Sequence, residues 1–426
     1  MEKLYTLSPE QILGANFAMA AKYCILAMDV GTGKSLTALH AAFNSGGKRI
    51  LVVVPSYLAY QWKAECKKFF PEKVVSVFYH VKEFHDPWDV DIVICTYQYV
   101  DEAQKLFNWC DTVICDEAHY LKNMETDRGG AIHTMVFENS LSRAYLLSGT
   151  IMENRVHELH SPLALMEYNP RFPESKFLKR FPNFIDFATY FSNLEEVVKK
   201  RGNRRWVERK WKGVKNKEEL QKYLKKHMIV IKSQDNIPFE DRNILISDIA
   251  DKALLDEFNT FLADPDSHGM SGTAKVRSAM AKVKVTVEHA KNLNRGGRPI
   301  IIFSDHIESA KKIAELLKCP CVTGATPANI RQREVNRFNE GDIEYLVATI
   351  GSLSTGYNLQ QSCSDMIFND YPWKPTAITQ ARGRIMRKNQ KNKCTFYFIL
   401  GSIQDEYILG TLTEKKELIK EVIYDE

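Results

Sequence analysis

The amino-acid sequence predicts an α/β protein of two parallel-sheet lobes, with a basic, mainly helical insertion between them. The chain has 426 residues, enough for two or three ordinary domains. Short apolar runs alternate with helix-length segments over the first 155 residues, and this alternation returns after residue 295. Strands buried on both faces and separated by helices are typical of parallel sheets. We therefore expect a first lobe at residues 1–157, the insertion at 158–240 and a second lobe at 241–426.

In the first lobe, four apolar runs rich in β-branched and aliphatic residues end in small, polar or acidic residues, as buried strands do. They are Arg49–Pro55, Asp91–Tyr97, Thr112–Glu117 and Arg143–Thr150. A further apolar run, Ile25–Val30, precedes a glycine-rich turn and a helix expected at Leu36–Phe43. Ligands of parallel sheets bind at the carboxyl ends of the strands, which is where the unusual residues of this chain fall.

The second lobe repeats this strand pattern. Its expected strands are Pro299–Ser304, Tyr345–Ile350, Asp365–Asp370 and Lys393–Leu400. Ala250–Asn294 has a helical pattern and is expected to project from this lobe. The insertion, rich in aromatic and basic residues, is mostly helical in period, and Leu220–Met228 is predicted to be an amphipathic helix.

Composition and sequence pattern argue against a disordered, a membrane-spanning or a secreted protein. Charged residues make up 26% and hydrophobic residues 44%, as in folded soluble chains. The sequence has no apolar run near the ~20 residues of a membrane span, and its first ten residues lack the apolar middle of a signal peptide. The nine cysteines form no framework, and Cys319 and Cys321 have no second pair at zinc spacing. We expect reduced thiols in a reducing compartment.

Positive charge is concentrated in the insertion. Residues 171–232 contain 18 Lys and Arg against 7 Asp and Glu, a net charge of +11, which leaves −6 for the rest of a chain whose total is +5. Within it, Lys199–Lys217 holds ten basic residues and one acidic residue around Trp206 and Trp211, and Gly202-Asn203 is a hairpin signal. A ribbon of this kind can contact nucleic acid at a duplex junction, with arginines on phosphates and a tryptophan on a base. The alternative is a solvated loop that its tryptophans anchor to the core. The candidate contacts are Lys199, Lys200, Arg201, Arg204, Arg205, Trp206 and Arg209.

A phosphate site is predicted at Gly31-Thr32-Gly33-Lys34-Ser35, directly before the first-lobe helix. Glycines let backbone N–H groups turn towards phosphate oxygens, and a helix N-terminus adds partial positive charge. Lys34 would contact the β- and γ-phosphates and Ser35 would hold Mg²⁺. The full GxxxxGK[ST] pattern is not met, because Met28 occupies the place of the first glycine. The alternative interpretation is a glycine-rich turn that caps a helix.

An acidic motif, Asp116-Glu117-Ala118-His119, follows an apolar strand 82 residues after Lys34. Asp116 can reach the Mg²⁺ shell beside Ser35, and Glu117 can orient and deprotonate a water for attack on the γ-phosphate. A solvated acidic loop is the alternative for this motif alone. The order of strand, Gly-Lys-Ser turn and strand with acidic pair favours an ATP or GTP site.

A third motif, Gln380–Arg387, places Arg384 and Arg387 three residues apart, and we therefore expect them on one helical face. Guanidinium groups suit the charge of a transferring phosphoryl group, and an arginine finger is worth roughly 10³–10⁵ in rate. A solvated basic helix is the alternative.

Together these motifs resemble, in order and spacing, motifs I, II, III and VI of superfamily 2 helicases, and more narrowly the Swi/Snf-type ATPases. Motif III is Ser148-Gly149-Thr150, ending in Glu153-Asn154. The resemblance covers about residues 5–400 and extends to further segments: Leu7–Gln11, Val54-Pro55 with Gln61-Trp62, Thr355–Leu359, Tyr371–Pro375 and Arg387–Gln390. The departures from the family's pattern are mild. Tyr357 and Thr32 each stand where leucine is commoner, and Ser35 stands where threonine is commoner.

The resemblance implies two RecA-like lobes that bind ATP and Mg²⁺ between them. Lys34 and Asp116 would act from one side and Arg384 and Arg387 from the other, so that hydrolysis is coupled to lobe closure. Nucleotide contacts would come from Gln11, Gly31, Thr32, Gly33, Lys34, Ser35, Gly356 and Gln380, and coupling from His119, Ser148 and Thr150. Positions matching the strand-gripping motifs are Pro55, Ser56, Thr96, Tyr97, Ser304, Thr323, Gly324, Thr349 and Asn358. Any single Ser or Thr among them could instead be an ordinary helix cap.

The implied function is an ATP-driven double-strand DNA translocase that unwinds or branch-migrates forks and junctions. The chain resembles small phage-encoded helicases and fork-remodelling enzymes, so a bacterial or phage-infected host cytoplasm is favoured and the nucleus is not excluded. An RNA helicase with the same motor is the nearest alternative, because strand choice depends on 2′-OH contacts that the sequence does not reveal. A second alternative, from another class, is an ATP-gated nucleic-acid-binding subunit of a larger assembly.

Overall fold

The computed structural model of the chain divides into two compact units. Unit 1 comprises Met1–Glu195, Trp211–Gln234 and Glu417–Glu426, and unit 2 comprises Glu196–Lys210 and Asp235–Lys416. The residues that the structure describes are 5–29, 31–78, 89–103, 106, 108–138, 141–167, 175–201, 204–233, 237–246, 252–263, 272–353, 357–387, 389–401 and 403–424. The segment 158–240, which the sequence sets apart, contributes helices and an edge strand to unit 1 and part of a two-stranded ribbon to unit 2.

Unit 1 is built on a parallel sheet of seven strands in the order β3-β4-β2-β5-β6-β1-β9. The strands are β1 (Tyr23–Met28), β2 (Ile50–Val54), β3 (Val75–Phe78), β4 (Ile92–Thr96), β5 (Thr112–Cys115), β6 (Arg143–Ser148) and β9 (Met228–Ile231). Alternate residues of β1 face two separate apolar cores, with Tyr23 and Ile25 on one side and Cys24 and Leu26 on the other. Burial on both faces explains the uninterrupted apolar runs from which these central strands were predicted.

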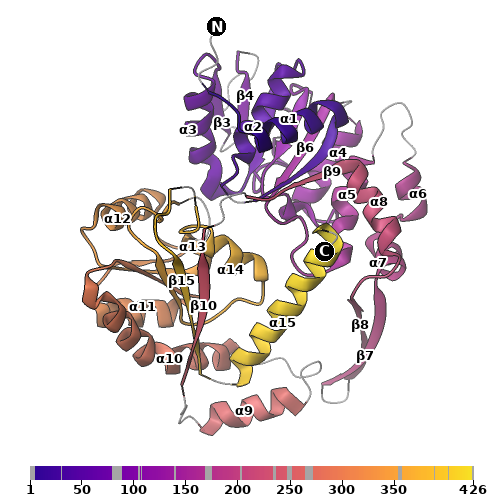
Figure 1. Cartoon of the computed structure of the whole chain (residues 1–426). Coiled ribbons are helices and arrows are strands. Elements are labelled where there is room, and N and C mark those ends of the chain that lie inside the picture. The colour runs from indigo at the N-terminus through magenta and orange to yellow at the C-terminus, as the bar shows by residue number, and fades with distance from the viewer. Residues whose placement is uncertain are drawn as a thin grey trace. The chain divides into compact units, whose positions relative to one another are not determined.

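Helices cover both faces of this sheet (Figure 1). On one face lie α1 (Pro9–Ala21), α2 (Lys34–Asn44) and α3 (Ala59–Phe69), and on the other α4 (Asp127–Glu138), α5 (His160–Met166), α7 (Phe184–Phe191) and α8 (Lys217–His227). Short 3₁₀ segments η1 (Ser56–Leu58), η4 (Ala118–Leu121) and η5 (Val156–Leu159) follow strand ends, and α6 (Lys176–Arg180) belongs to the insertion. The insertion is held by buried aromatic side chains, chiefly Phe177, Phe187 and Phe191.

The insertion also forms the hairpin that Gly202-Asn203 suggested. Strands β7 (Asn193–Arg201) and β8 (Arg204–Lys212) pair as a two-stranded sheet, and the turn itself lies outside the described residues. The predicted amphipathic helix is α8, which ends at His227, so that Met228 already belongs to β9. The described part of the insertion therefore combines helices α5 to α8 with the β7–β8 ribbon and the edge strand β9.

Unit 2 contains a second parallel sheet, in the order β10-β15-β14-β11-β13-β12. Its strands are β10 (Phe239–Leu245), β11 (Ile300–Ser304), β12 (Cys321–Val322), β13 (Tyr345–Thr349), β14 (Asp365–Phe368) and β15 (Cys394–Leu400). Its helices are α9 (Lys252–Ala263), α10 (Gly272–Leu293), α11 (Ile307–Leu317), α12 (Ala328–Glu340), α13 (Ile350–Leu353) and α14 (Pro375–Arg382). A short η6 (Asn294–Gly296) precedes β11, and α15 (Ile403–Ile419) with the π-helical η7 (Lys420–Tyr424) closes the described chain. The predicted helical segment is thus two helices, α9 and α10.

The core of unit 2 includes buried polar groups at the carboxyl ends of its strands. Lys282 of α10 is fully buried, and its Nζ lies 2.7 Å from Asp405 Oδ1 and 4.9 Å from the Tyr371 ring centroid. Thr286 Oγ1 donates to Asn369 Oδ1 at 2.6 Å, directly after β14. A buried charge is retained only when it is paired in this way, so α10 is fixed against the strand ends.

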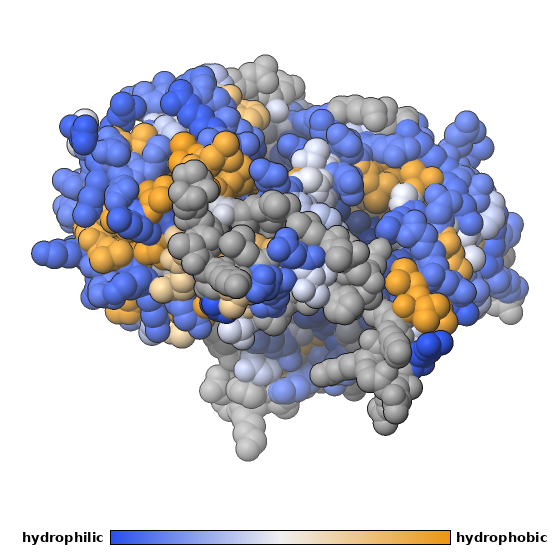
Figure 2. Space-filling view, turned by 90° about the horizontal axis from the view of Figure 1, so that it is seen from below, coloured by the Kyte–Doolittle hydropathy of each residue, from blue (hydrophilic) through white to orange (hydrophobic). Residues whose placement is uncertain are grey.

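Among the described helices, none has a stretch long and apolar enough to cross a membrane. The face seen in Figure 2 is mostly hydrophilic, and its apolar side chains form separate patches. All nine cysteines are free thiols, and seven of them are buried. Burial raises the pKa of these thiols above its ordinary value, which keeps them unreactive.

Candidate nucleotide and nucleic-acid sites

The glycine-rich turn after β1 has the backbone of a phosphate-binding loop. Gly31 and Gly33 have φ of +87° and +81°, a region that side chains with a Cβ rarely occupy. Gly33 is the N-cap of α2, which begins at Lys34, two residues before the predicted start. An eleven-residue helix with a glycine at its N-cap leaves its first N–H groups directed at the loop.

The Lys34 ammonium lies across this loop. Its Nζ donates to the carbonyl oxygens of Met28 at 3.0 Å and Asp29 at 3.3 Å, and Thr32 Oγ1 donates to Asp29 O at 2.7 Å. The structure thus brings a cation and the first N–H groups of α2 into the same turn. Both features favour an anion with several oxygen atoms.

Gln11 is joined to the same loop. It closes a capping box with Ser8 at the start of α1, and its Nε2 donates to Thr32 O at 3.2 Å. A Cβ on Gly33 would lie 2.1 Å from Gln11 Nε2, so this contact requires glycine. Gln11, one of the predicted nucleotide contacts, therefore borders the phosphate loop.

Gly33→Ala is expected to weaken ATP binding as well as folding. The left-handed backbone costs alanine about 1–2 kcal/mol. The displaced Gln11 side chain loses a hydrogen bond worth ~1 kcal/mol, so we expect the Kd for ATP to rise at least about fivefold. Gly46, with φ of +86° and open space around its Cα, is the matched control. Gly46→Ala should lower Tm similarly in thermal unfolding and leave the Kd for ATP unchanged; equal Kd values in the two variants would contradict the assignment of the loop.

Asp116 is held at the end of β5 by two donors. Trp62 Nε1 donates to Oδ2 at 2.8 Å, and the Glu117 backbone N–H donates to Oδ1 at 2.8 Å. Burial raises the pKa of the Asp116 carboxyl to about 6, and the neighbouring Glu117 adds to this rise, while Lys34 and the Trp62 hydrogen bond oppose it. The carboxylate of Asp116 and the hydroxyl of Ser35 are hard oxygen ligands of the kind Mg²⁺ takes, and a cation would favour the charged carboxylate.

Two aromatic residues support Asp116 in roles that the sequence analysis missed. Trp62 is almost fully buried, and the one polar atom of its side chain, Nε1, donates its hydrogen bond to Asp116. Tyr97, predicted as a nucleic-acid contact, is also buried, and its hydroxyl donates to the Asp116 carbonyl at 2.9 Å while its ring stacks on Tyr120. Burial raises the pKa of Tyr97 well above its ordinary value, so the phenol stays a donor. A buried Trp or Tyr needs a partner for its polar atom, but the burial of Trp62 depends on tertiary packing, so the sequence carried no signal for this role.

Glu117 has a left-handed backbone, with φ of 51° and ψ of 52°. Non-glycine residues in this region are uncommon and cluster at functional sites. Glu117 Oε2 lies 3.3 Å from His119 Nδ1, and His119 Nε2 lies 4.0 Å from Glu153 Oε1, beyond β6. The acidic motif is thereby connected to the Ser148–Thr150 segment, where Thr150 N donates to Ser148 Oγ at 3.0 Å. The three predicted coupling residues therefore lie in two adjoining segments.

The predicted strand-gripping residues differ in exposure. Ser56, at the start of η1, is exposed, whereas Pro55 and Thr96 are buried. In unit 2, Thr323 and Thr349 are buried. Their carbonyl and N–H groups are used locally: Thr326 Oγ1 accepts from Thr323 N at 2.9 Å, and Ser352 Oγ donates to Thr349 O at 2.7 Å.

Ser304 is fully buried, and its hydroxyl is hydrogen-bonded to a carboxylate inside unit 2. Its hydroxyl donates to Asp370, which also accepts from His306 Nδ1 at 2.6 Å and from Asp305 N at 3.1 Å. Burial alone would raise the pKa of Asp370, but the donors around it, His306 first among them, hold it below its ordinary value. The same pair raises the pKa of His306. The hydroxyl of Ser304 is thus part of the buried end of the sheet rather than of a surface.

Arg384 and Arg387 do not lie on a helical face, so this prediction is wrong. α14 ends at Arg382, and Gly383 begins a series of turns. Arg384 is 4% exposed, and it donates from Nε to Gln380 O at 3.1 Å and from Nη1 to Tyr357 O at 3.2 Å. Arg387 donates to Asn358 Oδ1. The arginine-bearing turn is therefore joined to the segment that follows Gly356, a residue outside the described part of the chain.

Arg382, the first arginine of this motif, has a structural role. Its guanidinium lies 4.7 Å from the Phe396 ring centroid and 5.2 Å from that of Phe398, and Nη2 donates to Asp241 Oδ2 at 2.8 Å. These contacts fix the end of α14 to β15 and β10.

The two ribbon tryptophans have different surroundings. Trp206 is 46% exposed beside the exposed Val207, while Trp211, which belongs to unit 1, packs against His157 and Phe184 of the same unit. Arg209 Nε contacts Glu196 Oε1 at 3.2 Å across the strands, and Arg205 is exposed. The side chains of Lys199, Lys200, Arg201 and Arg204 lie outside the described part of the structure. Thus one tryptophan is available to a ligand, and the other anchors the ribbon.

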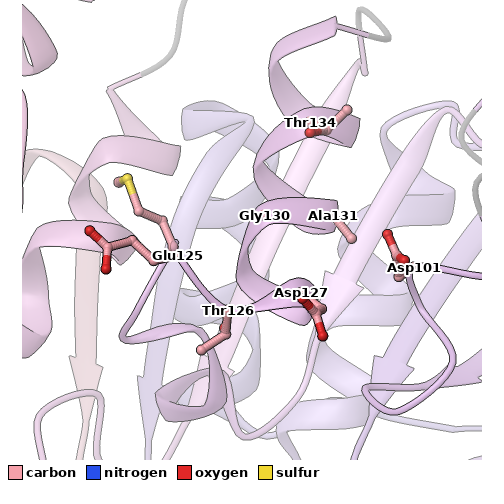
Figure 3. A pocket seen from close by; sticks show the side chains of 8 residues that line it. Asp101, Glu125, Thr126, Asp127, Gly130, Ala131 and Thr134 are labelled. Carbon is pink, nitrogen blue, oxygen red and sulfur yellow. The ribbon is translucent and has the colours of Figure 1, made fainter.

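A polar pocket of about 310 Å³ lies elsewhere in unit 1, at the start of α4 (Figure 3). Asp101, Glu125 and Asp127 line it, and the carboxylate of Glu125 points away from the other two. Three carboxylates disfavour a triphosphate, so this pocket is not the nucleotide site.

The fold and the two sets of strand-end motifs define a class: a two-lobed α/β protein with a phosphate loop and acidic motif in one lobe and an arginine-bearing turn in the other. The sequence model of the SNF2-related domain matches residues 16–230, and that of the helicase conserved C-terminal domain matches residues 281–389. The first match covers half of the chain. The chain belongs to the SNF2-related family of superfamily 2.

Individual relatives are distant. The chain is 25% identical to SWI/SNF-related matrix-associated actin-dependent regulator of chromatin subfamily A-like protein 1 of Xenopus tropicalis, over 97% of this chain and 44% of the relative. It is also 25% identical to the mouse DNA annealing helicase and endonuclease ZRANB3, over 97% of this chain and 40% of the relative. A solved structure, the Sulfolobus solfataricus SWI2/SNF2 ATPase core in complex with dsDNA, matches 99% of this chain and 93% of its own at 20% identity, with a TM-score of 0.45. The chain spans less than half the length of these two curated relatives.

Proposed function

We propose that this chain hydrolyses ATP and uses the energy to move along duplex DNA, and that it thereby unwinds or remodels forks and junctions. The observation that supports this most is the Asp116–Glu117 pair beside the Lys34 loop. Asp116 is fixed by Trp62 and is close enough to Lys34 for the ammonium to lower its pKa. This arrangement suits phosphoryl transfer to water.

Each first-lobe residue has a part in the proposed reaction. Lys34 and the N–H groups at the start of α2 bind the β- and γ-phosphates, and Gln11 orients the base. Asp116 and Ser35 would hold Mg²⁺, which when bound neutralises charge on the phosphates. Glu117, whose strained backbone directs its carboxylate, orients the attacking water and takes its proton.

The second lobe supplies arginine side chains to the γ-phosphate in this proposal. Arg387 is the better candidate, because Arg384 is 4% exposed and donates to two backbone carbonyls. Because residues of both lobes are then required together, nucleotide turnover opens and closes the lobes in a cycle. Lobes that grip a strand alternately would convert that cycle into translocation.

The nucleic-acid partner is inferred from charge and from relatives. The insertion carries a net charge of +11 over residues 171–232, and its ribbon presents Arg205 and Trp206 to solvent. One relative is named a DNA annealing helicase, which favours DNA over RNA and a task at branched substrates. The hydroxyl of Ser56 and the turn bearing Asn358 are candidate contacts to the phosphate backbone.

The direct test is the rate of ATP hydrolysis by the purified chain on single-stranded, duplex, forked and four-way DNA and on RNA of the same sequences. We expect duplex and branched DNA to raise kcat well above the rate without nucleic acid. A larger increase with RNA would establish the RNA helicase instead. Equal rates with and without every substrate would refute a translocase.

Neutralising the ribbon is expected to weaken DNA binding and to reduce its dependence on salt. Replacing Lys199, Lys200, Arg204 and Arg205 with glutamine removes up to four phosphate contacts, which would lower the slope of log affinity against log salt by up to about 3–4. Binding is measured by fluorescence anisotropy at several salt concentrations. The control replaces four exposed lysines of α3, α8 and α11: Lys67, Lys68, Lys222 and Lys311. If the slope is unchanged in the ribbon variant, or falls equally in the control, the ribbon is not the contact.

A further inference from the structure

We propose that Trp211 is a positioning residue: it makes the rate of ATP hydrolysis depend on whether DNA is bound to the β7–β8 ribbon. This inference rests on the proposed function. Its basis is a continuous series of contacts within unit 1 that runs from Glu117 to the base of β8.

The first part of the series leaves the acidic motif. Glu117 contacts His119 at 3.3 Å, and the other ring nitrogen of His119 faces Glu153 Oε1 at 4.0 Å. Glu153 is 4% exposed, and its second oxygen accepts from Lys122 Nζ at 2.8 Å. Glu117, the proposed base, is therefore linked through the His119 ring to a buried carboxylate whose position Lys122 fixes.

The second part joins Glu153 to η5. Lys122 Nζ also lies 3.6 Å from Glu158 Oε1, and Glu158 Oε2 accepts from the backbone N–H groups of Glu153 at 2.7 Å and Asn154 at 3.0 Å. Burial lowers the pKa of Lys122, but the two carboxylates outweigh it and raise the pKa overall, so the lysine stays charged. The two carboxylates are buried while the lysine is 34% exposed, so separating them from Lys122 would leave two buried charges without their cation. Glu153 and Glu158 thus move together.

The third part reaches the ribbon. His157, adjacent to Glu158, packs edge-on against Trp211 with ring centroids 5.8 Å apart, and Phe184 of α7 lies 6.0 Å from both rings. Trp211 Nε1 donates to Thr189 Oγ1 at 3.4 Å. Trp211 is the penultimate residue of β8, and Lys212 pairs with Glu195 of β7 at 2.8 Å. A displacement of the paired strands therefore reaches His157 through Trp211.

The division of work between the two ribbon tryptophans makes the inference testable. Trp206 is exposed and suited to a ligand, whereas Trp211 is packed and distant from the turn. A contact residue sets how much DNA is needed for stimulation, and a positioning residue sets the rate once DNA is saturating. A residue that only stabilises the fold would instead lower every rate and Tm together.

The experiment compares Trp211→Ala with Trp206→Ala in ATP hydrolysis titrated with duplex DNA. For Trp211→Ala we expect the kcat at saturating DNA to fall about five- to tenfold, with the rate in the absence of DNA unchanged. For Trp206→Ala we expect the DNA concentration of half-maximal stimulation to rise while the maximal rate stays. Trp211→Phe, which keeps a ring against His157, should restore most of the stimulated rate.

His157→Ala supplies an independent variant from the other side of the contact. If the contact carries the coupling, the double variant with Trp211→Ala loses no more stimulation than either single variant. Full stimulation in Trp211→Ala would overturn the inference, and so would a loss that is equal with and without DNA and parallels a fall in Tm. If the unaltered chain itself shows no stimulation, it is the proposed function that fails.

Discussion

Glu117→Gln is expected to lower the rate of ATP hydrolysis by about 10²–10⁴-fold, the usual contribution of a general base. Glutamine has nearly the same shape but cannot accept the proton of the attacking water. Because Lys34, Asp116 and Ser35 remain, the affinities for ATP and for DNA should be largely retained. Single-turnover hydrolysis measures the chemical step, and equilibrium binding of a fluorescent ATP analogue measures the affinity.

The matched control is Glu125→Gln. Glu125 is exposed, lies in the same connecting segment and points away from its acidic neighbours. The Glu125→Gln variant should hydrolyse ATP at the same rate as the unaltered chain. Normal hydrolysis by Glu117→Gln would show that another group acts as the base. Loss of nucleotide binding together with activity would show that Glu117 shapes the loop rather than the chemistry.

Much of the fold could be predicted because buried segments consist mainly of apolar residues, which are visible in the sequence. Central strands such as β2 and β11 are covered on both faces, and so they appear as apolar runs of four or five residues. The strands that were missed lie at or beside sheet edges. β10 exposes most of its residues and carries Glu240, Asp241 and Arg242, so its pattern is that of a loop. β12 is two residues long, and the pairing of β9 with β1 joins segments some two hundred residues apart.

The site was predictable only where its chemistry is local. The Gly31–Ser35 loop and the Asp116-Glu117 pair are contiguous, so spacing and residue type suffice. The hydrogen bond from Trp62 to Asp116 joins α3 to the end of β5, and no local pattern encodes it. Residue type also failed at Ser304, because a hydroxyl at a strand end can face a buried carboxylate as well as a ligand. Helical spacing failed at Arg384 because Gly383 ends the helix.

Arg387→Ala is expected to lower the kcat for DNA-stimulated ATP hydrolysis by about 10³-fold or more, the effect of removing an arginine finger. Arg387 is partly exposed, and it donates to Asn358 Oδ1 in the adjoining segment and from Nε to Gly383 O at 2.5 Å. Any fall in Tm on its removal should be too small to account for the loss of kcat. Arg387→Lys should recover only a small part of the rate, because an ammonium lacks the planar fork of donors.

Two nearby residues, Arg382 and Lys391, serve as controls for the Arg387→Ala variant. Arg382→Ala removes a guanidinium packed on Phe396 and paired with Asp241, and should lower Tm more than Arg387→Ala does. Lys391→Ala removes one exposed charge from the same segment and should change neither quantity. Since Arg387 lies in unit 2 and Lys34 in unit 1, a selective loss of kcat would show that both lobes act on one nucleotide. A kcat that survives in Arg387→Ala, or that falls only in proportion to Tm, would show that hydrolysis is completed within the first lobe alone.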